Sequence, residues 1–180
     1  SGGTFSGTHN AGDGSDSVIF NGGAMANATF NNAGAIDAGI SVASGNVTID
    51  SGTSIDAYSL SVSNAASVMI ADGVDLGATS LLGDITVQNG GTFGGTGRLR
   101  TGGTFINQGT YAPGQSIGTQ IITGDYSQSA GGTLEIEFDD TSVDLVDISG
   151  SAVLAGTVEL IELAPGIQQT TTHVFLEADG

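Results

Sequence analysis

The side chains that could do chemistry in this sequence are mostly carboxylates. The 180 residues include 19 acidic residues, two arginines, no lysine and no cysteine, and the formal net charge is −17. The two histidines, His9 and His173, stand near opposite ends of the sequence, and we expect both to be surface residues. The remaining route to catalysis is a pair of carboxylates, of the kind that cleaves glycosidic bonds.

Two patterns resemble parts of active sites. Gly114-Gln115-Ser116-Ile117-Gly118 has the Gly-x-Ser-x-Gly form of a hydrolase nucleophile elbow. That elbow needs a strand before the serine and a helix after it, and the surrounding residues predict no such pair, so we interpret the string as a turn. Glu135 and Glu137 lie two residues apart on an expected solvent face, without aromatic residues to bind a sugar. We therefore predict that the chain is not an enzyme, and a glycan-acting enzyme is the weaker alternative.

Calcium is the one metal for which the sequence offers candidates. Residues 12–18 fit most of a calcium-binding nonapeptide, in which Asp13 and Asp16 would be ligands, but Ala11 replaces the first glycine and the tandem copies are missing. A second candidate is an acidic group whose oxygens suit calcium: Asp139, Asp140, Asp144 and Asp147. The competing interpretations are a polar turn and a solvated acidic face. No other cofactor is predicted.

The charge and the missing cysteine exclude several classes of protein. Two arginines, Arg98 and Arg100, cannot neutralise a phosphate backbone or hold the chain on an anionic membrane, so no nucleic-acid partner is expected. We expect the arginines to pair with acidic residues of neighbouring structural repeats. A disulfide scaffold and a thiolate zinc site are impossible without cysteine. Residues 1–10 lack the features of a signal peptide, so we expect a mature or excised piece.

Short strands dominate the predicted secondary structure. Apolar residues recur two positions apart between glycine- and asparagine-rich turns, which places each pair on one face of a strand: Val18/Phe20, Ile40/Val42, Val47/Ile49, Leu60/Val62, Val68/Ile70, Val74/Leu76 and Ile85/Val87. No segment shows convincing helical periodicity. The phrase Gly-Gly-Thr followed by an apolar residue occurs four times, and we interpret it as a turn that leads directly into a strand.

The apolar pairs also recur at longer range, about 20 residues apart. The spacing joins Ile40 to Leu60, Leu60 to Leu81, Val47 to Val68, Ile85 to Phe105, and Phe105 to Tyr126. A period of this length without helices is typical of a solenoid in which strands stack coil upon coil. We predict an all-β, right-handed parallel β-helix: residues 1–110 form its coils, and residues 111–180 form a C-terminal cap of longer strands in the same solenoid.

Residues 90–163 resemble the C-terminal part of an autotransporter passenger domain, exported by type V secretion in Gram-negative bacteria. The resemblance is carried by three phrases: Gly-Gly-Thr-Phe-Gly-Gly-Thr-Gly at 90–97, Ala-Pro-Gly-Gln-Ser-Ile-Gly-Thr at 112–119, and Gly-Gly-Thr-Leu-Glu-Ile-Glu at 131–137. It implies a β-helix delivered to the cell surface through an outer-membrane β-barrel, which the parent chain would contain. It also implies a folding nucleus, the autochaperone region, in residues 110–163. The nucleus would include Tyr111, Pro113, Gly114, Ile117, Leu134, Ile136 and Phe138.

Two functions are consistent with these features. The first is a cell-surface or secreted passenger segment that acts as a structural stalk or adhesin scaffold and contacts molecules of a host or neighbouring cell. The second is a self-associating extracellular fibre subunit, because the ends of a solenoid expose unpaired strand edges and calcium could relieve the repulsion between acidic surfaces.

Overall fold

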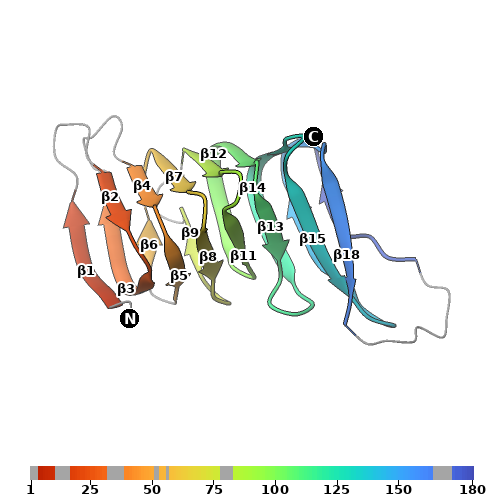
Figure 1. Ribbon diagram of the computed structural model, residues 1–180, viewed down its shortest axis with the longest axis horizontal. Coiled ribbons are helices and arrows are strands. Elements are labelled where there is room, and N and C mark those ends of the chain that lie inside the picture. The colour runs from red at the N-terminus through yellow and green to blue at the C-terminus, as the bar shows by residue number, and fades with distance from the viewer. Residues whose placement is uncertain are drawn as a thin grey trace.

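The computed structural model describes residues 4–10, 17–31, 39–50, 53–55, 57–77, 83–163 and 172–180. Every regular element within these ranges is a strand, and they contain no helix that could cross a membrane. The strands wind into a parallel β-solenoid of about 5 turns, spaced about 23 residues apart (Figure 1). The predicted all-β parallel β-helix is therefore confirmed, with a mean repeat slightly longer than the spacing seen in the sequence.

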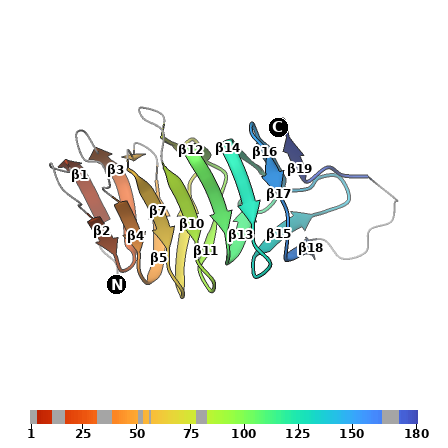
Figure 2. The ribbon, with the colours of Figure 1, turned by 90° about the horizontal axis from the view of Figure 1, so that it is seen from above.

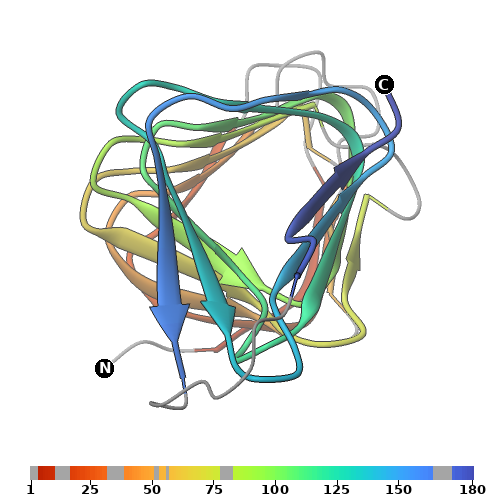
Figure 3. The ribbon, with the colours of Figure 1, turned by 90° about the vertical axis from the view of Figure 1, so that its right-hand side faces the viewer.

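The solenoid has three sides, which the strand register distinguishes (Figure 3). Side 1 contains β2 (Ser17–Phe20), β4 (Gly39–Val42), β7 (Ser59–Val62), β10 (Asp84–Val87), the second parts of β12 (Arg98–Asn107) and β14 (Thr119–Gln128), and β17 (Ala152–Val153). Side 2 contains the first parts of β1 (Thr4–Asn10) and β3 (Gly23–Asn31), then β5 (Gly45–Ile49), β8 (Ala66–Ile70), β11 (Thr92–Gly95), β13 (Thr110–Pro113), β15 (Thr133–Phe138) and β18 (Thr157–Glu162).

Side 3 is built from the shorter strands and from the remaining parts of the bent ones. It contains the second parts of β1 and β3, then β6 (Ser54–Ile55), β9 (Asp75–Leu76), the first parts of β12 and β14, β16 (Leu145–Ile148) and β19 (Leu176–Ala178). β1 and β12 each turn a corner of the solenoid, so that one strand contributes to two sides. The corners are marked by register shifts between Phe5 and Gly7 in β1 and between Arg100 and Thr104 in β12. All pairings between these strands are parallel, as Figure 2 shows for the successive arrows of each side.

The core is made of stacked rows of inward side chains. The row on side 1 is Ile40, Leu60, Ile85, Phe105 and Tyr126, paired strand to strand and at most 2% exposed. The row on side 2 is Val47, Val68, Phe93, Tyr111 and Leu134. The row on side 3 is Leu76, Leu99, Ile122 and Ile148. Burying these rows is the main favourable term in folding.

Most of the long-range spacings predicted these rows correctly. Ile40 pairs with Leu60, and Phe105 pairs with Tyr126. The pairing of Leu60 with Leu81 was wrong, because Leu60 is in register with Ile85. Leu81 lies outside the described residues. A longer connection between two coils therefore breaks the simple period at that point.

The Gly-Gly-Thr phrase leads into a strand in the copies at 90–93 and 131–134, whereas the copy at 102–105 lies inside β12, at its register shift. In the copy at residues 90–93, Gly90 adopts a φ of +81° and Phe93 is fully buried in β11. Such a φ is readily adopted by glycine and disfavoured for other residues. Within residues 111–180, where longer strands were predicted, β14 has 10 residues and β15 and β18 have 6 each, and β12, which also has 10, precedes that range.

Candidate functional site

The Asp144 carboxylate forms the centre of the candidate site in the C-terminal coils. Its side chain is fully buried. Oδ1 accepts a hydrogen bond of 2.9 Å from the Gly118 N–H, and Oδ2 accepts one of 2.8 Å from the Glu137 N–H. Gly118 precedes β14 and Glu137 lies in β15, so one side chain joins two segments of the chain. We call this arrangement the Asp144 clip.

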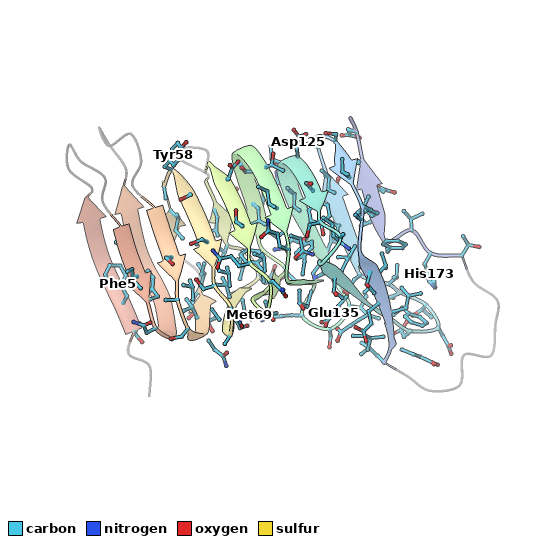
Figure 4. The ribbon with its side chains drawn as sticks, turned by 45° about the horizontal axis from the view of Figure 1, so that its top comes forward. Phe5, Tyr58, Met69, Asp125, Glu135 and His173 are labelled. Carbon is cyan, nitrogen blue, oxygen red and sulfur yellow. The ribbon has the colours of Figure 1, made fainter. Side chains whose placement is uncertain are left out.

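A small cavity of about 130 Å³ lies beside the clip on the outside of side 2. Met69 and Glu135 line it from β8 and β15, and Figure 4 shows both side chains on the same side of the solenoid. The rest of its wall comes from the end of β13, the turn after it and two further carboxylates: Ala112, Pro113, Gly114, Gln115, Ser116, Glu137 and Asp144. The cavity therefore combines an apolar part with an acidic part.

Burial and neighbouring charges raise the pKa of two carboxyls in this cavity. Burial raises the pKa of Asp144 to about 6, although its backbone hydrogen bonds act in the opposite direction. The pKa of Glu135 is raised by partial burial and by the charges of Glu159 and Glu137. A proton is therefore held more tightly on these two groups in the folded chain than in the unfolded chain.

Ser116 lines the cavity without the surroundings of a nucleophile elbow. It is exposed, has a φ of +66°, and lies in the turn between the strands β13 and β14. The expected turn is therefore present, and the strand-to-helix context of a hydrolase elbow is not found at this position. Glu135 lies partly buried and Glu137 donates its backbone N–H to Asp144.

The acidic residues proposed for calcium have different environments. Asp139 Oδ1 accepts hydrogen bonds from the backbone of Thr141 and Ser142, at 2.8 Å each, and closes a local turn. Asp140 is exposed, and Asp147 is half-buried in β16. Within the described ranges, no group of three or more His, Asp or Glu residues could hold a metal ion. Asp13 and Asp16 lie outside the described residues, so calcium binding stays a prediction.

The residues that the family resemblance implies for a folding nucleus lie together in two neighbouring coils. Tyr111, Leu134 and Ile136 are fully buried, and Tyr111 pairs with Leu134 across β13 and β15. The others lie at the ends of these strands or in the turn that follows β13: Pro113, Gly114, Ile117 and Phe138. The Asp144 clip connects this turn to β15.

Three buried amides are part of the interior, and the sequence reasoning did not identify them. Asn107 donates from Nδ2 to the Thr133 carbonyl at 2.9 Å, and Gln128 donates from Nε2 to the Thr157 carbonyl at 2.9 Å. Gln120 donates to the Gly97 carbonyl at 3.2 Å. A signal was present for two of them, because Asn107 and Gln128 follow the inward residues of side 1 by two positions. Alternation therefore places them inside.

One of the two arginines forms the expected ion pair between coils. Arg100 donates from Nε and Nη2 to the two carboxylate oxygens of Asp75, at 2.7 and 2.8 Å. The hydrogen bond from Arg100 lowers the pKa of Asp75, and the same bond raises the pKa of Arg100. The two strands β9 and β12 are thus joined on the outer surface as well as by their backbone.

Comparison with known protein families, curated proteins and solved structures finds no match for this chain. The geometry therefore supplies the argument for function. The clip, the interior amides and the stacked core rows hold neighbouring coils together, since each links segments from different coils or turns.

Proposed function

We propose that this chain is a non-enzymatic structural scaffold, a stalk or adhesin-like passenger segment at the surface of a Gram-negative cell. In this proposal the C-terminal coils fold first and serve as the template for the rest. The parent protein would carry an outer-membrane barrel that delivers the solenoid. The support comes from the parallel β-helix fold and from how the interior of its C-terminal coils is built.

The observation that carries the proposal is a cluster of aromatic rings inside these coils. Phe105 packs against Tyr111 with ring centroids 4.8 Å apart, and against Tyr126 at 5.5 Å. Phe93 joins the cluster at 5.3 Å from Phe105. Aromatic pairs in such geometries contribute about 0.5–1.5 kcal/mol each beyond the area they bury. The residues that continue these rows in the preceding coils are aliphatic, as at Ile40 and Leu60, and the aromatic pair of the first coil, Phe5 and Phe20, is only partly buried.

Hydrogen bonds inside the same coils add directional contacts to this cluster. The Tyr126 hydroxyl donates to Gln128 Oε1 at 2.9 Å, and Gln128 in turn binds the backbone near β18. Asn107 binds the backbone of β15. Satisfied buried polar networks specify one arrangement of neighbouring strands, which is what a folding template requires.

The test compares two leucines that are fully buried on parallel strands, Leu134 in β15 and Leu60 in β7. Each is changed to alanine in the full chain, and folding and unfolding rates are measured in urea. If the C-terminal coils fold first, Leu134→Ala slows refolding and gives a high φ-value, whereas Leu60→Ala mainly speeds unfolding. Equal φ-values for the two variants, or a higher value for Leu60→Ala, would refute the folding-nucleus proposal.

The proposed location has its own test. The chain is placed upstream of an outer-membrane translocation barrel in a Gram-negative host, and its exposure is measured by protease added to intact cells. We expect the full chain to reach the surface, and Leu134→Ala to reduce the exposed amount more than Leu60→Ala does. A chain that is retained in the periplasm while the barrel inserts normally would count against a passenger role.

A further inference from the structure

Within the described residues, the coil formed by β17, β18 and β19 has a neighbouring coil on one side only. In β18, Val158 and Leu160 are in register with Leu134 and Ile136, which are fully buried. Val158 is nevertheless 38% exposed and Leu160 is 61% exposed. They continue the interior row of side 2, but no strand lies on their other side within the described residues.

On side 3 of this coil, the inward residues also have a neighbouring strand on one side only. Leu176 and Ala178 in β19 pair with the buried Val146 and Ile148 of β16, and β19 has no further strand beside it in the part of the chain that the structure describes. We call the inward side chains of β18 and β19 the end face, namely Val158, Leu160, Leu176 and Ala178. Figure 3 looks onto this end of the solenoid.

The apolar surface of the described chain is concentrated near this end. Six of its eight exposed large hydrophobic residues lie in the last coil: Val153, Leu154, Val158, Leu160, Leu163 and Val174. Exposed apolar side chains next to unpaired strand edges are typical of an interaction site.

At the opposite end of the solenoid, the edge strands belong to the same two sheets as the edge strands of the C-terminal end. β1 and β18 are the two edges of one sheet, and β2 and β19 are the two ends of the strand path in the other sheet. The two parts of β1 belong to sides 2 and 3, and β2 belongs to side 1. A second copy displaced along the solenoid axis would therefore place β1 beside β18 and β19, and β2 beside β17, with all strands parallel.

Two inward residues of the first coil, on sides 1 and 2, are also apolar. Phe5 packs edge-on against Phe20 with ring centroids 5.8 Å apart, and both are only partly buried. Figure 4 shows Phe5 at the end of the solenoid away from Glu135. Contact with Val158 and Leu160 would therefore bring two incomplete apolar interiors together.

Charge favours this arrangement over a contact between two C-terminal ends. β18 carries Glu159 and Glu162, so pairing β18 with itself would bring four carboxylates to one seam. β1 and β2 contain no acidic residue, and β1 contains His9. The N-terminal strands thus lack the carboxylates that would oppose pairing with an acidic strand.

We propose that the end face binds the N-terminal coil of a second copy of this chain, so that copies associate head to tail through parallel strand pairing. The proposal goes beyond the scaffold function and does not depend on the order in which the coils fold. The chain's charge of −17 opposes association, so moderate salt should strengthen it.

The first test measures association of the full chain by sedimentation velocity over a range of concentrations at neutral pH, in low and moderate salt. Leu160→Glu should weaken association by at least about tenfold. Tyr58→Glu is the matched control, because Tyr58 is 58% exposed against 61% for Leu160 but precedes β7 in the middle of the solenoid. A chain that stays monomeric, or an equal effect of the two changes, would overturn the proposal.

The second test identifies the surfaces in contact and does not alter the core. The chain has no cysteine, so single cysteines can be introduced at exposed positions on the two edges, as Thr4→Cys in β1 and Glu159→Cys in β18. The two variants are mixed and treated with a short thiol cross-linker. Head-to-tail stacking predicts that the mixed product exceeds both homodimers. The proposal would be overturned if the homodimer linked through position 159 were in excess. It would also be overturned if cross-linking did not exceed that of the same mixture at high dilution.

Discussion

Gly118 and Asp144 lie 26 residues apart and are joined by a hydrogen bond of 2.9 Å from the Gly118 N–H to Asp144 Oδ1. The other oxygen of the same carboxylate binds the Glu137 N–H. A single buried side chain thus satisfies two backbone donors from different coils, which explains why an aspartate is tolerated inside the wall of the solenoid.

Removal of this carboxylate should destabilise the protein. We expect Asp144→Ala to lower the free energy of unfolding by about 2 kcal/mol at pH 5, below the folded pKa of Asp144, because two backbone N–H groups lose their acceptor. Asp140→Ala is the control, since Asp140 is exposed in the neighbouring turn and should cost less than about 0.5 kcal/mol. Urea unfolding followed by circular dichroism measures both, and equal losses would show that the clip is not a stabilising contact.

The stability of the chain should depend on pH through the same group. Asp144 has a pKa of about 6 in the folded chain, well above that of an unfolded aspartate, so folding takes up a proton between these values. Its stabilising contribution is therefore complete below the unfolded pKa and is lost as pH rises through the folded pKa. We expect the free energy of unfolding to fall by about 2 kcal/mol between pH 4 and pH 6.5.

The variant Asp144→Asn separates the titration of Asp144 from that of the other carboxyl groups. The raised pKa of Glu135 also makes the free energy of unfolding fall as pH rises. The lowered pKa of Asp75 has the opposite effect, because its ion pair with Arg100 is lost only at more acidic pH. Unfolding midpoints at several pH values should show a much flatter dependence in Asp144→Asn than in the original chain. The same slope in both would mean that Asp144 is not the group that titrates.

Two buried tyrosines should respond in opposite ways to loss of the hydroxyl. Among the described residues, the Tyr111 hydroxyl has no hydrogen-bond partner, whereas the Tyr126 hydroxyl donates to Gln128 Oε1 at 2.9 Å. We expect Tyr126→Phe to cost about 1 kcal/mol, and Tyr111→Phe to be neutral or stabilising, because it removes an unsatisfied buried group. Thermal unfolding compares the pair, and a larger loss for Tyr111→Phe would contradict this assignment.

Two glycines with positive φ separate backbone strain from steric overlap. Gly73 has a φ of +74° and open space where a Cβ would be, so Gly73→Ala should cost about 1 kcal/mol through strain alone. Gly95 has a φ of +116°, and a Cβ there would overlap the Ile70 carbonyl of the neighbouring coil. We expect Gly95→Ala to cost more than about 3 kcal/mol, since strain and overlap add. Similar melting temperatures for the two variants would contradict the close approach of the coils at Gly95.

The sequence alone determined which residues face the interior. Strand alternation has a period of two, so Val47 and Ile49 had to share a face, and their recurrence at Val68 and Ile70 indicated that another coil lies above them. The same alternation carried a signal for Asn107 and Gln128, two positions after Phe105 and Tyr126, although the sequence analysis did not use it. These inferences succeed because they depend on local backbone geometry, which neighbouring residues set.

The tertiary structure decided what each residue meets across coils. The sequence placed Asp144 among four aspartates as a calcium candidate, but its binding partner Gly118 lies in an earlier coil, and no sequence spacing reveals that contact. The pairing of Leu60 with Ile85 depends on the length of a connection between coils. Val158 has the same pattern as Leu134, yet one is exposed and the other is buried. The difference arises because the burial of an inward residue requires a coil on both sides, and only the folded stack shows where the last coil lies.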